Sequence, residues 1–276
     1  MVPAEYRRAE RAARRLISEY AIRAPADIDI EAIALDQGLY VTTGPLSGSW
    51  ARLLRRGTGG VVRISSSIQS EGQRRFCVAH EVGHFLLHAD QNQIERCMFT
   101  DLLPGHARRT EEPEANAFAG ELLMPAKIFS SYLDETTLSL EMLDDLSNAF
   151  TATISATIHR VVDLAVHVCA LVRSEAGRMR SFHVCHDFPF RLRSMGSRLD
   201  ARSCAGEFFR DGFGAERQAD VPADAWLEDQ HLQGLYGHET VRELTVPMPN
   251  YDTALTLLWL VPGSSLDDVA AELDGF

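Results

Sequence analysis

The pattern of apolar and polar residues in the first part of the chain predicts two helices followed by strands. A helix is predicted over residues 4–23 and a second over residues 29–37, where Gly38 ends it. Runs of strand-forming residues at 40–42 and 61–64 predict two strands, with a glycine-rich turn before the second. An edge strand of such a small sheet can hold an extended peptide through main-chain hydrogen bonds.

A further helix is predicted around the apolar stripe that runs from Phe76 to Leu87. Its apolar side chains recur at steps of three and four residues, so they form one face that a core can bury. Two histidines, His80 and His84, lie largely on another face, where a cleft can open. The apolar face consists of Phe76, Ala79, Val82, Leu86 and Leu87.

A helix with an acidic start is predicted over residues 111–125. Pro113 suits its first turn, and Pro125 follows its end. The preceding residues 89–110 mix polar side chains with proline and glycine, which predicts a loop near the cleft. The stripe that the helix can bury consists of Ala115, Phe118, Ala119, Leu122 and Leu123.

Helices are also predicted over residues 126–133 and 138–166. Within the second, residues 147–155 resemble the turn of a helix-turn-helix. A DNA-reading helix needs basic and amide side chains near the bases. The predicted helix over 138–166 instead carries four acidic residues and Arg160. We therefore expect a structural or protein-binding helical segment and no direct binding of DNA.

The chain changes to a strand pattern after residue 166. Residues 264–273 predict a closing helix with a serine N-cap. Three parts are therefore expected: residues 1–130, a helical, helix-turn-helix-like segment over 131–166, and an α/β sensor-like domain over 167–276. The overall fold class is α+β. The strands predicted in the last part are residues 168–172, 179–184, 241–246 and 254–260.

Residues 80–84, His-Glu-Val-Gly-His, form an HExxH motif inside a predicted helix. Residues four apart lie on one side of a helix, so His80 and His84 can bind one metal ion together. Glu81 can then reach a water on the metal and accept its proton as general base.

His88 continues this four-residue series but does not fit the same metal site. About 12 Å of helix axis separates it from His80, too far for both imidazoles to reach one ion at bond lengths of about 2.0–2.1 Å. A role at the end of the helix is expected for His88, so the third ligand must come from another part of the chain.

The acidic helix can supply this third ligand. Glu112 offers a carboxylate, and Asn116 lies four residues later on the same side, where it can steady a ligand by a hydrogen bond. Glu111 and Glu114 are the alternatives, because sequence does not set the phase of a helix near a proline.

The segments Arg74–His88 (RRFCVAHEVGHFLLH) and Glu112–Pro125 (EPEANAFAGELLMP) carry a combined pattern. Together they resemble the ImmA/IrrE-type zinc metallopeptidase family, and residues 24–41 also match the opening of that family. The resemblance implies a cytosolic, gluzincin-like endopeptidase that cleaves a helix-turn-helix repressor and so induces a stress response. The matching residues are His80, His84 and Glu112 for the metal ligands and Glu81 for the catalytic base. For residues 167–276, the resemblance to longer members implies a GAF-like domain.

Composition and charge narrow the classes of partner. The 276-residue chain is 45% hydrophobic and has a net charge of −12, which disfavours non-specific binding of nucleic acid. Basic residues are clustered only locally, as at Arg52–Arg56, where a solvated face is the expectation. No run of 18 apolar residues indicates a membrane span, and the first residues lack the apolar core of a signal peptide. The cytoplasm is the expected location.

The five cysteines are not arranged as a metal or disulfide motif. They are odd in number and include no CxxC pair, so reduced and mostly buried thiols are expected. Strand alternation points His183 and Cys185 to one face and His186 to the other, which favours packing over metal binding.

These observations favour a zinc-dependent endopeptidase in which Glu81 activates water. Two imidazoles and one carboxylate suit Zn²⁺, although Mn²⁺, Fe²⁺ and Co²⁺ occupy similar sites. The alternative is a non-proteolytic, metal-containing regulator that acts by binding a repressor partner.

Overall fold

The computed structural model places the described residues in two compact units. One comprises residues 1–133 and 142–157, and the other comprises residues 134–141 and 158–276. We call them unit 1 and unit 2. The structure describes residues 4–88, 95–97, 111–133, 138–164, 167–185, 187–212, 216–228, 239–248, 252–260 and 266.

Unit 1 contains a four-stranded sheet in the order β1-β3-β2-β4. β1 runs parallel to β3, whereas β2 runs antiparallel to both of its neighbours. Leu53, Val62 and Ile64 are completely buried, so this face of the sheet lies against the core. The strands are β1 (Leu39–Gly44), β2 (Ala51–Arg56), β3 (Gly59–Ser65) and β4 (Glu95–Cys97).

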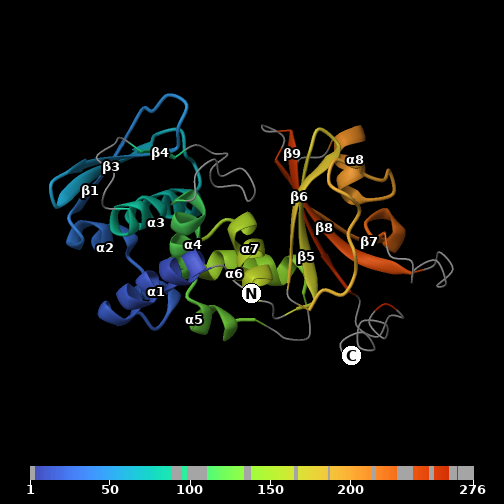
Figure 1. Cartoon of the computed structure of the whole chain (residues 1–276), viewed down its shortest axis with the longest axis horizontal. Coiled ribbons are helices and arrows are strands. Elements are labelled where there is room, and N and C mark those ends of the chain that lie inside the picture. Colours follow the sequence, from blue (N-terminus) through green and yellow to red (C-terminus); the bar gives the residue numbers. More distant parts are fainter. Residues whose placement is uncertain are drawn as a thin grey trace. The chain divides into compact units, whose positions relative to one another are not determined.

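Helices cover the buried face of this sheet (Figure 1). One continuous core joins them to the strands, with Leu16, Val78 and Phe118 among its fully buried members. Arg14 of the first helix donates a hydrogen bond to Glu121 of the fourth at 2.8 Å. The helices are α1 (Ala4–Glu19), α2 (Ile30–Asp36), α3 (Glu71–Leu87), α4 (Glu111–Leu123) and α5 (Ala126–Ser130), with a short 3-10 helix at Pro25–Asp27.

The helix predicted over 138–166 is two helices, α6 (Leu140–Phe150) and α7 (Ile154–Leu164). The break falls at Thr151, whose positive φ of 48° is incompatible with a continuing right-handed helix. Thr153 then accepts a hydrogen bond from the Ala156 N–H at 3.2 Å and so caps the start of α7. The boundary between the two units falls inside both helices.

Unit 2 contains a five-stranded antiparallel sheet in the order β6-β5-β9-β8-β7. Helix α8 (Cys204–Asp211) contributes Cys204 and Ala205 to a core that also holds Trp226. The strands are β5 (Cys169–Glu175), β6 (Arg178–Val184), β7 (Arg217–Pro222), β8 (Thr240–Met248) and β9 (Thr253–Trp259), with a 3-10 helix, η3, at Ala223–Ala225.

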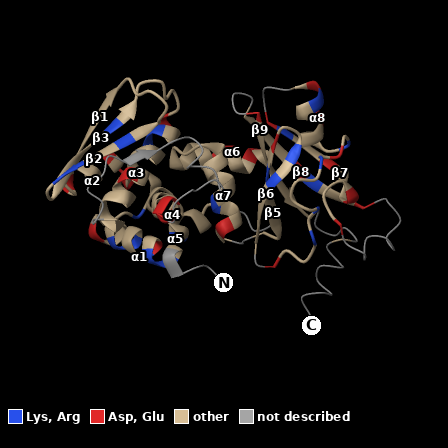
Figure 2. Cartoon of the chain, turned by 45° about the horizontal axis from the view of Figure 1, so that its top comes forward, with Lys and Arg blue, Asp and Glu red and all other residues tan. Residues whose placement is uncertain are grey.

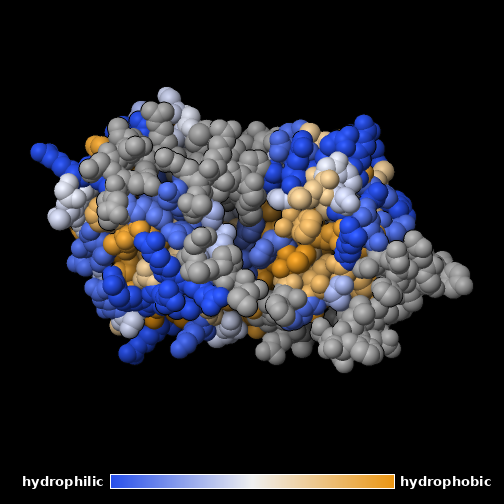
Figure 3. Space-filling model, in the orientation of Figure 1, coloured by the Kyte–Doolittle hydropathy of each residue, from blue (hydrophilic) through white to orange (hydrophobic). Residues whose placement is uncertain are grey.

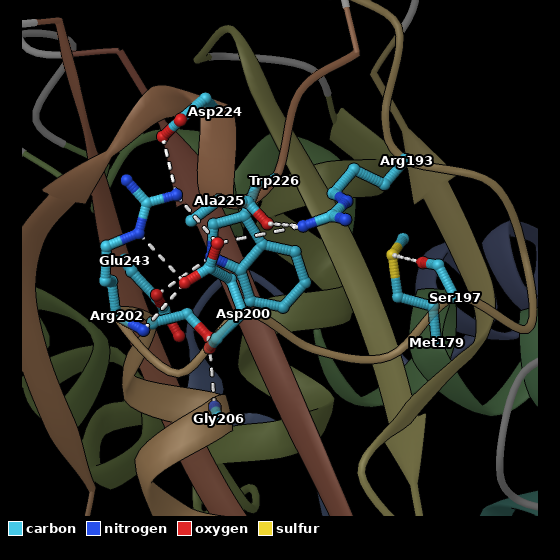
Figure 4. A network of polar contacts seen from close by, with 11 residues as sticks. Met179, Arg193, Ser197, Asp200, Arg202, Gly206, Asp224, Ala225, Trp226 and Glu243 are labelled. Carbon is cyan, nitrogen blue, oxygen red and sulfur yellow. Dashed lines mark hydrogen bonds and ion pairs between the residues drawn. The ribbon is translucent and has the colours of Figure 1, made fainter. Parts of the chain in front are cut away.

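A buried carboxyl group ties several elements of unit 2 together. Glu243 of β8 is fully buried and accepts hydrogen bonds from the Ala205 N–H and the Thr245 hydroxyl, both at 2.8 Å. The Trp226 indole N–H donates to its other oxygen at 2.9 Å, as Figure 4 shows. Because Ala205 lies in the first turn of α8, these bonds hold that helix against the sheet.

The structure adds elements that the sequence pattern did not predict. β2, β7 and α8 were not predicted, and β4 lies inside the segment 89–110 that was predicted as a loop. The remainder of that segment, most of the predicted closing helix and His186 lie outside the described residues.

The visible surface of unit 1 is largely hydrophilic, whereas that of unit 2 also carries a hydrophobic area (Figure 3). Tyr40 is 63% exposed and Met195 is 66% exposed, and they are among a few large apolar side chains at the surface. Within the described part of the chain, no helix is long and apolar enough to cross a membrane.

Candidate metal site

Helices α3 and α4 cross closely at Gly83. A Cβ atom at this position would lie 3.0 Å from Phe118 Cδ1 and 3.3 Å from Ala115 Cα, closer than the usual contact of about 3.5–4.0 Å between carbon atoms. The missing side chain therefore lets the two helices approach. This approach brings the acidic start of α4 beside the HExxH segment of α3.

Three buried side chains meet at this crossing. His80 Nε2 lies 2.9 Å from His84 Nε2, and Glu112 Oε2 lies 3.2 Å from His80 Nε2 and 3.3 Å from His84 Nε2. Ligand atoms of a tetrahedral ion with bonds of about 2.0–2.1 Å are separated by about 3.3 Å. The three residues thus form a group whose spacing and chemistry suit one metal ion.

Burial and the neighbouring groups favour a neutral His84 and an ionised Glu112. Burial, and then the proximity of His80, lower the pKa of His84 to about 4. Burial alone would raise the pKa of Glu112, but its close contacts with the imidazoles of His80 and His84 outweigh burial and hold that pKa well below its usual range. A neutral imidazole and a carboxylate are the protonation states in which these side chains bind metals.

Asn116 orients one of the imidazoles. Its Oδ1 lies 2.9 Å from Nδ1 of His80, on the side of the ring opposite the nitrogen that faces His84 and Glu112. An amide oxygen accepts a hydrogen bond there, which places the proton on Nδ1 and leaves Nε2 as the free electron donor. Asn116 therefore fixes the tautomer that metal binding requires.

The other candidate ligands lie apart from the three-residue group. Glu114 Oε2 is 3.6 Å from His88 Nε2 and 3.9 Å from Arg8, so it faces α1 and the end of α3. His88 is the C-cap of α3, and its N–H donates to the His84 carbonyl at 3.0 Å. Glu111, like Glu114, does not belong to the group that can hold a metal ion.

Glu81 lies between the two histidines in sequence and is completely buried. It does not belong to the three-residue group. Burial, and then the nearby Glu81 carboxylate, raise the pKa of the neighbouring Cys77 thiol to about 12. The site therefore combines a ligand group from α3 and α4 with a further buried acid, Glu81, on α3.

Arg55 is a contributor that the sequence did not reveal. Its guanidinium donates a hydrogen bond to the His84 carbonyl and lies 4.6 Å from the centre of the Phe85 ring. A cation is favourable near the last carbonyls of a helix, where the dipole is negative. Figure 2 shows the basic residues of the sheet and the acidic residues of α4. Arg55 was grouped with a solvated basic cluster because β2 was not predicted.

Comparisons with known proteins give a family match for part of the chain and a similar fold. Residues 34–162 match the Peptidase M78 family, described as the IrrE N-terminal-like domain. No curated protein matches the chain. A solved structure of a Mycobacterium tuberculosis transcriptional regulator is similar, with a TM-score of 0.58 and 17% identity, over 91% of this chain and 76% of that one. At this identity, the likeness shows a shared fold.

Proposed function

We propose that the chain is a metal-dependent endopeptidase with a gluzincin-like site, on the premise that its residues 34–162 match the IrrE N-terminal-like domain. The observation that carries this proposal is the buried group of His80, His84 and Glu112, whose ligand atoms all lie within 4.8 Å of one another. Two imidazoles and one carboxylate leave a fourth position open, which is the arrangement of a catalytic rather than a structural metal site.

His80, His84 and Glu112 would hold the metal ion, and Zn²⁺ suits this ligand set best. Mn²⁺, Fe²⁺ and Co²⁺ are alternatives, since similar ligands bind them. When bound, the ion would polarise the scissile carbonyl and lower the pKa of the attacking water. Asn116 keeps the proton of His80 on Nδ1 and so holds its ring in the ligating orientation.

Glu81 would act as the general base of the reaction. It accepts the proton of the attacking water and later returns a proton to the amine that leaves. Its placement one residue after His80 supports this role, because the helix then carries base and ligands on adjoining faces. Burial of the site strengthens electrostatic interactions with charge that develops during the reaction.

The proposed substrate is a helix-turn-helix repressor whose cleavage induces a stress response in the cytoplasm. β4 lies at one edge of the described sheet, because it is the last strand in the order and pairs there only with β2. An extended segment of substrate can add to such an edge through main-chain hydrogen bonds. The family resemblance supports a repressor as the partner, and the solved relative is itself a transcriptional regulator.

The test is incubation of the metal-loaded protein with a helix-turn-helix repressor from the same organism. We expect one discrete cut by the native protein. We expect a loss of at least about 100-fold in rate with Glu81→Gln, because the ligands remain while the base is removed. Full cleavage by Glu81→Gln would contradict the proposed mechanism.

The second candidate is a regulator that binds the repressor without cutting it. The same variant separates the two, because Glu81→Gln keeps metal and partner binding and would leave this regulatory effect unchanged. Residues 167–276, which lie in unit 2 and are proposed to form a GAF-like sensor domain, are compatible with either function. Its antiparallel sheet, with α8 contributing to the core, supports a separate folded unit.

A further inference from the structure

Two thiols lie side by side in unit 2, apart from the residues of the metal group. Cys169 begins β5, and Cys185 directly follows β6, one position beyond the cross-strand pair Ala170–Val184. The Cys185 N–H donates to the Cys169 carbonyl at 3.1 Å, so the backbones remain neighbours at this point. Cys169 is completely buried and Cys185 is 3% exposed. Both are free thiols.

Three donors converge on the sulfur of Cys185. The Cys169 N–H lies 3.3 Å from Cys185 Sγ, and the Cys169 thiol and the Asp187 N–H also donate to it. Hydrogen bonds to the charged form of a group stabilise that form.

The arrangement makes the two thiols chemically different. The Cys169 thiol, followed by the backbone donors, lowers the pKa of Cys185 to about 6, although burial opposes this shift. The same hydrogen bond between the two thiols, and then burial, raise the pKa of Cys169. The arrangement therefore favours ionisation of Cys185 over ionisation of Cys169, as in a reactive cysteine beside its resolving partner.

We propose that Cys169 and Cys185 are a redox pair that hydroperoxides convert into an intramolecular disulfide. The Cys185 thiolate attacks one peroxide oxygen, so an S–O bond forms, the O–O bond breaks, and the departing hydroxide takes a proton to become water. The Cys169 sulfur then attacks the Cys185 sulfur, the S–O bond breaks, and the Cys169 proton leaves with the hydroxide as a second water. Two thiols and one hydrogen peroxide thus give one disulfide and two waters.

The backbone geometry is compatible with this bond. Opposed residues in antiparallel strands have Cα atoms about 4.5–5.5 Å apart, and disulfides need about 4.4–6.8 Å. The bond would join the start of β5 to the end of β6. Cys77 and Cys204 provide internal controls, because they are buried thiols whose pKa burial raises to about 12.

The test uses the full chain, reduced and then treated with a small excess of hydrogen peroxide. Free thiols are blocked with N-ethylmaleimide under unfolding conditions, and the protein is digested without reduction for mass spectrometry. We expect a linked pair of peptides containing Cys169 and Cys185 that is two hydrogens lighter than the separate peptides. Loss of free Cys185 should be at least about tenfold faster than loss of Cys77 or Cys204, which keep their protons at neutral pH.

Two variants separate the pair from general oxidation. With Cys169→Ser, we expect no link and a sulfenic acid on Cys185 that dimedone traps, whereas Cys204→Ser should form the link as the native chain does. The proposal is overturned if peroxide leaves Cys169 and Cys185 free. Oxidation of Cys185 to the sulfinic acid without a link, or equal oxidation rates for all the buried cysteines, would also overturn it.

Discussion

At the scale of single residues, the most telling contacts surround His80. The HExxH spacing predicted that His80 and His84 face one ion, and the structure places their Nε2 atoms 2.9 Å apart. The proposed choice of Glu112 over Glu111 and Glu114 depended on helix phase near a proline, and a contact between distant segments brings Glu112 to the two histidines. No short-range pattern in the sequence encodes that contact.

Replacement of Asn116 should weaken metal binding without removing a ligand. In Asn116→Ala, the His80 ring loses the acceptor at Nδ1, so we expect metal affinity to fall by about 10- to 100-fold. Asn116→Asp, which keeps an acceptor oxygen, should restore most of the affinity. Competition with a metal-binding dye measures both values, and unchanged affinity in Asn116→Ala would rule out the positioning role.

At the scale of elements, the sequence was most informative where helical periodicity was strong. A helix was predicted at the place of α3, and α4 was predicted near its observed bounds, because both segments carry regular apolar stripes. β2 was not predicted, since its sequence ARLLRR has the appearance of a basic cluster when strand pairing is unknown. The break between α6 and α7 falls inside residues 147–155, which resemble the turn of a helix-turn-helix, although one helical range was predicted over 138–166. Thr151 adopts a positive φ there, which is uncommon for a residue other than glycine.

The crossing of α3 and α4 should tolerate no side chain at Gly83. In Gly83→Ala, the new methyl group would meet Phe118 and the α4 backbone, so we expect a loss of about 1–3 kcal/mol in the free energy of unfolding. Gly120→Ala on α4 is the matched control. Nothing lies within 4 Å of its added Cβ, and alanine favours a helix by up to about 1 kcal/mol.

Urea unfolding of the two glycine variants gives the comparison. A destabilised Gly83→Ala beside a neutral or stabilised Gly120→Ala supports close helix contact as the reason for the glycine. Equal changes in both variants would mean that helix propensity alone explains them. The metal affinity of Gly83→Ala should fall as well, because the crossing also positions Glu112.

At the scale of the whole molecule, the sequence predicted a mixed α+β protein and a change of character near residue 166. The division into two units follows contacts instead, and its boundary runs through α6 and α7. A helix with apolar side chains can bury them against either neighbour, so periodicity does not assign it to a unit. The proposed division into three parts therefore stays a prediction, which assays of the separate parts would test.

The stability of unit 2 should depend on pH through Glu243. Burial raises its pKa despite the hydrogen bonds it accepts, so the folded chain binds its proton at higher pH than the unfolded chain. Its stabilising contribution is complete below the unfolded pKa of about 4.3 and is lost as pH rises through the folded pKa. The stability of the native protein relative to Glu243→Gln should therefore fall as pH rises across this window.

Unfolding of unit 2, followed by tryptophan fluorescence at a series of pH values, measures this difference. Glu243→Gln should also be less stable by about 1–3 kcal/mol at acid pH, because its amide can accept with only one of two atoms while three donors face it. A stability difference that stayed constant with pH would show that Glu243 does not titrate in this range.

The most direct measurement of the central claim is the metal content of the protein purified without added metal. Elemental analysis should find about one metal ion per chain in the native protein and in His88→Ala, since His88 lies apart from the group of His80, His84 and Glu112. His84→Ala should have lost the ion. Equal metal content in His84→Ala and His88→Ala would contradict the assignment of the site.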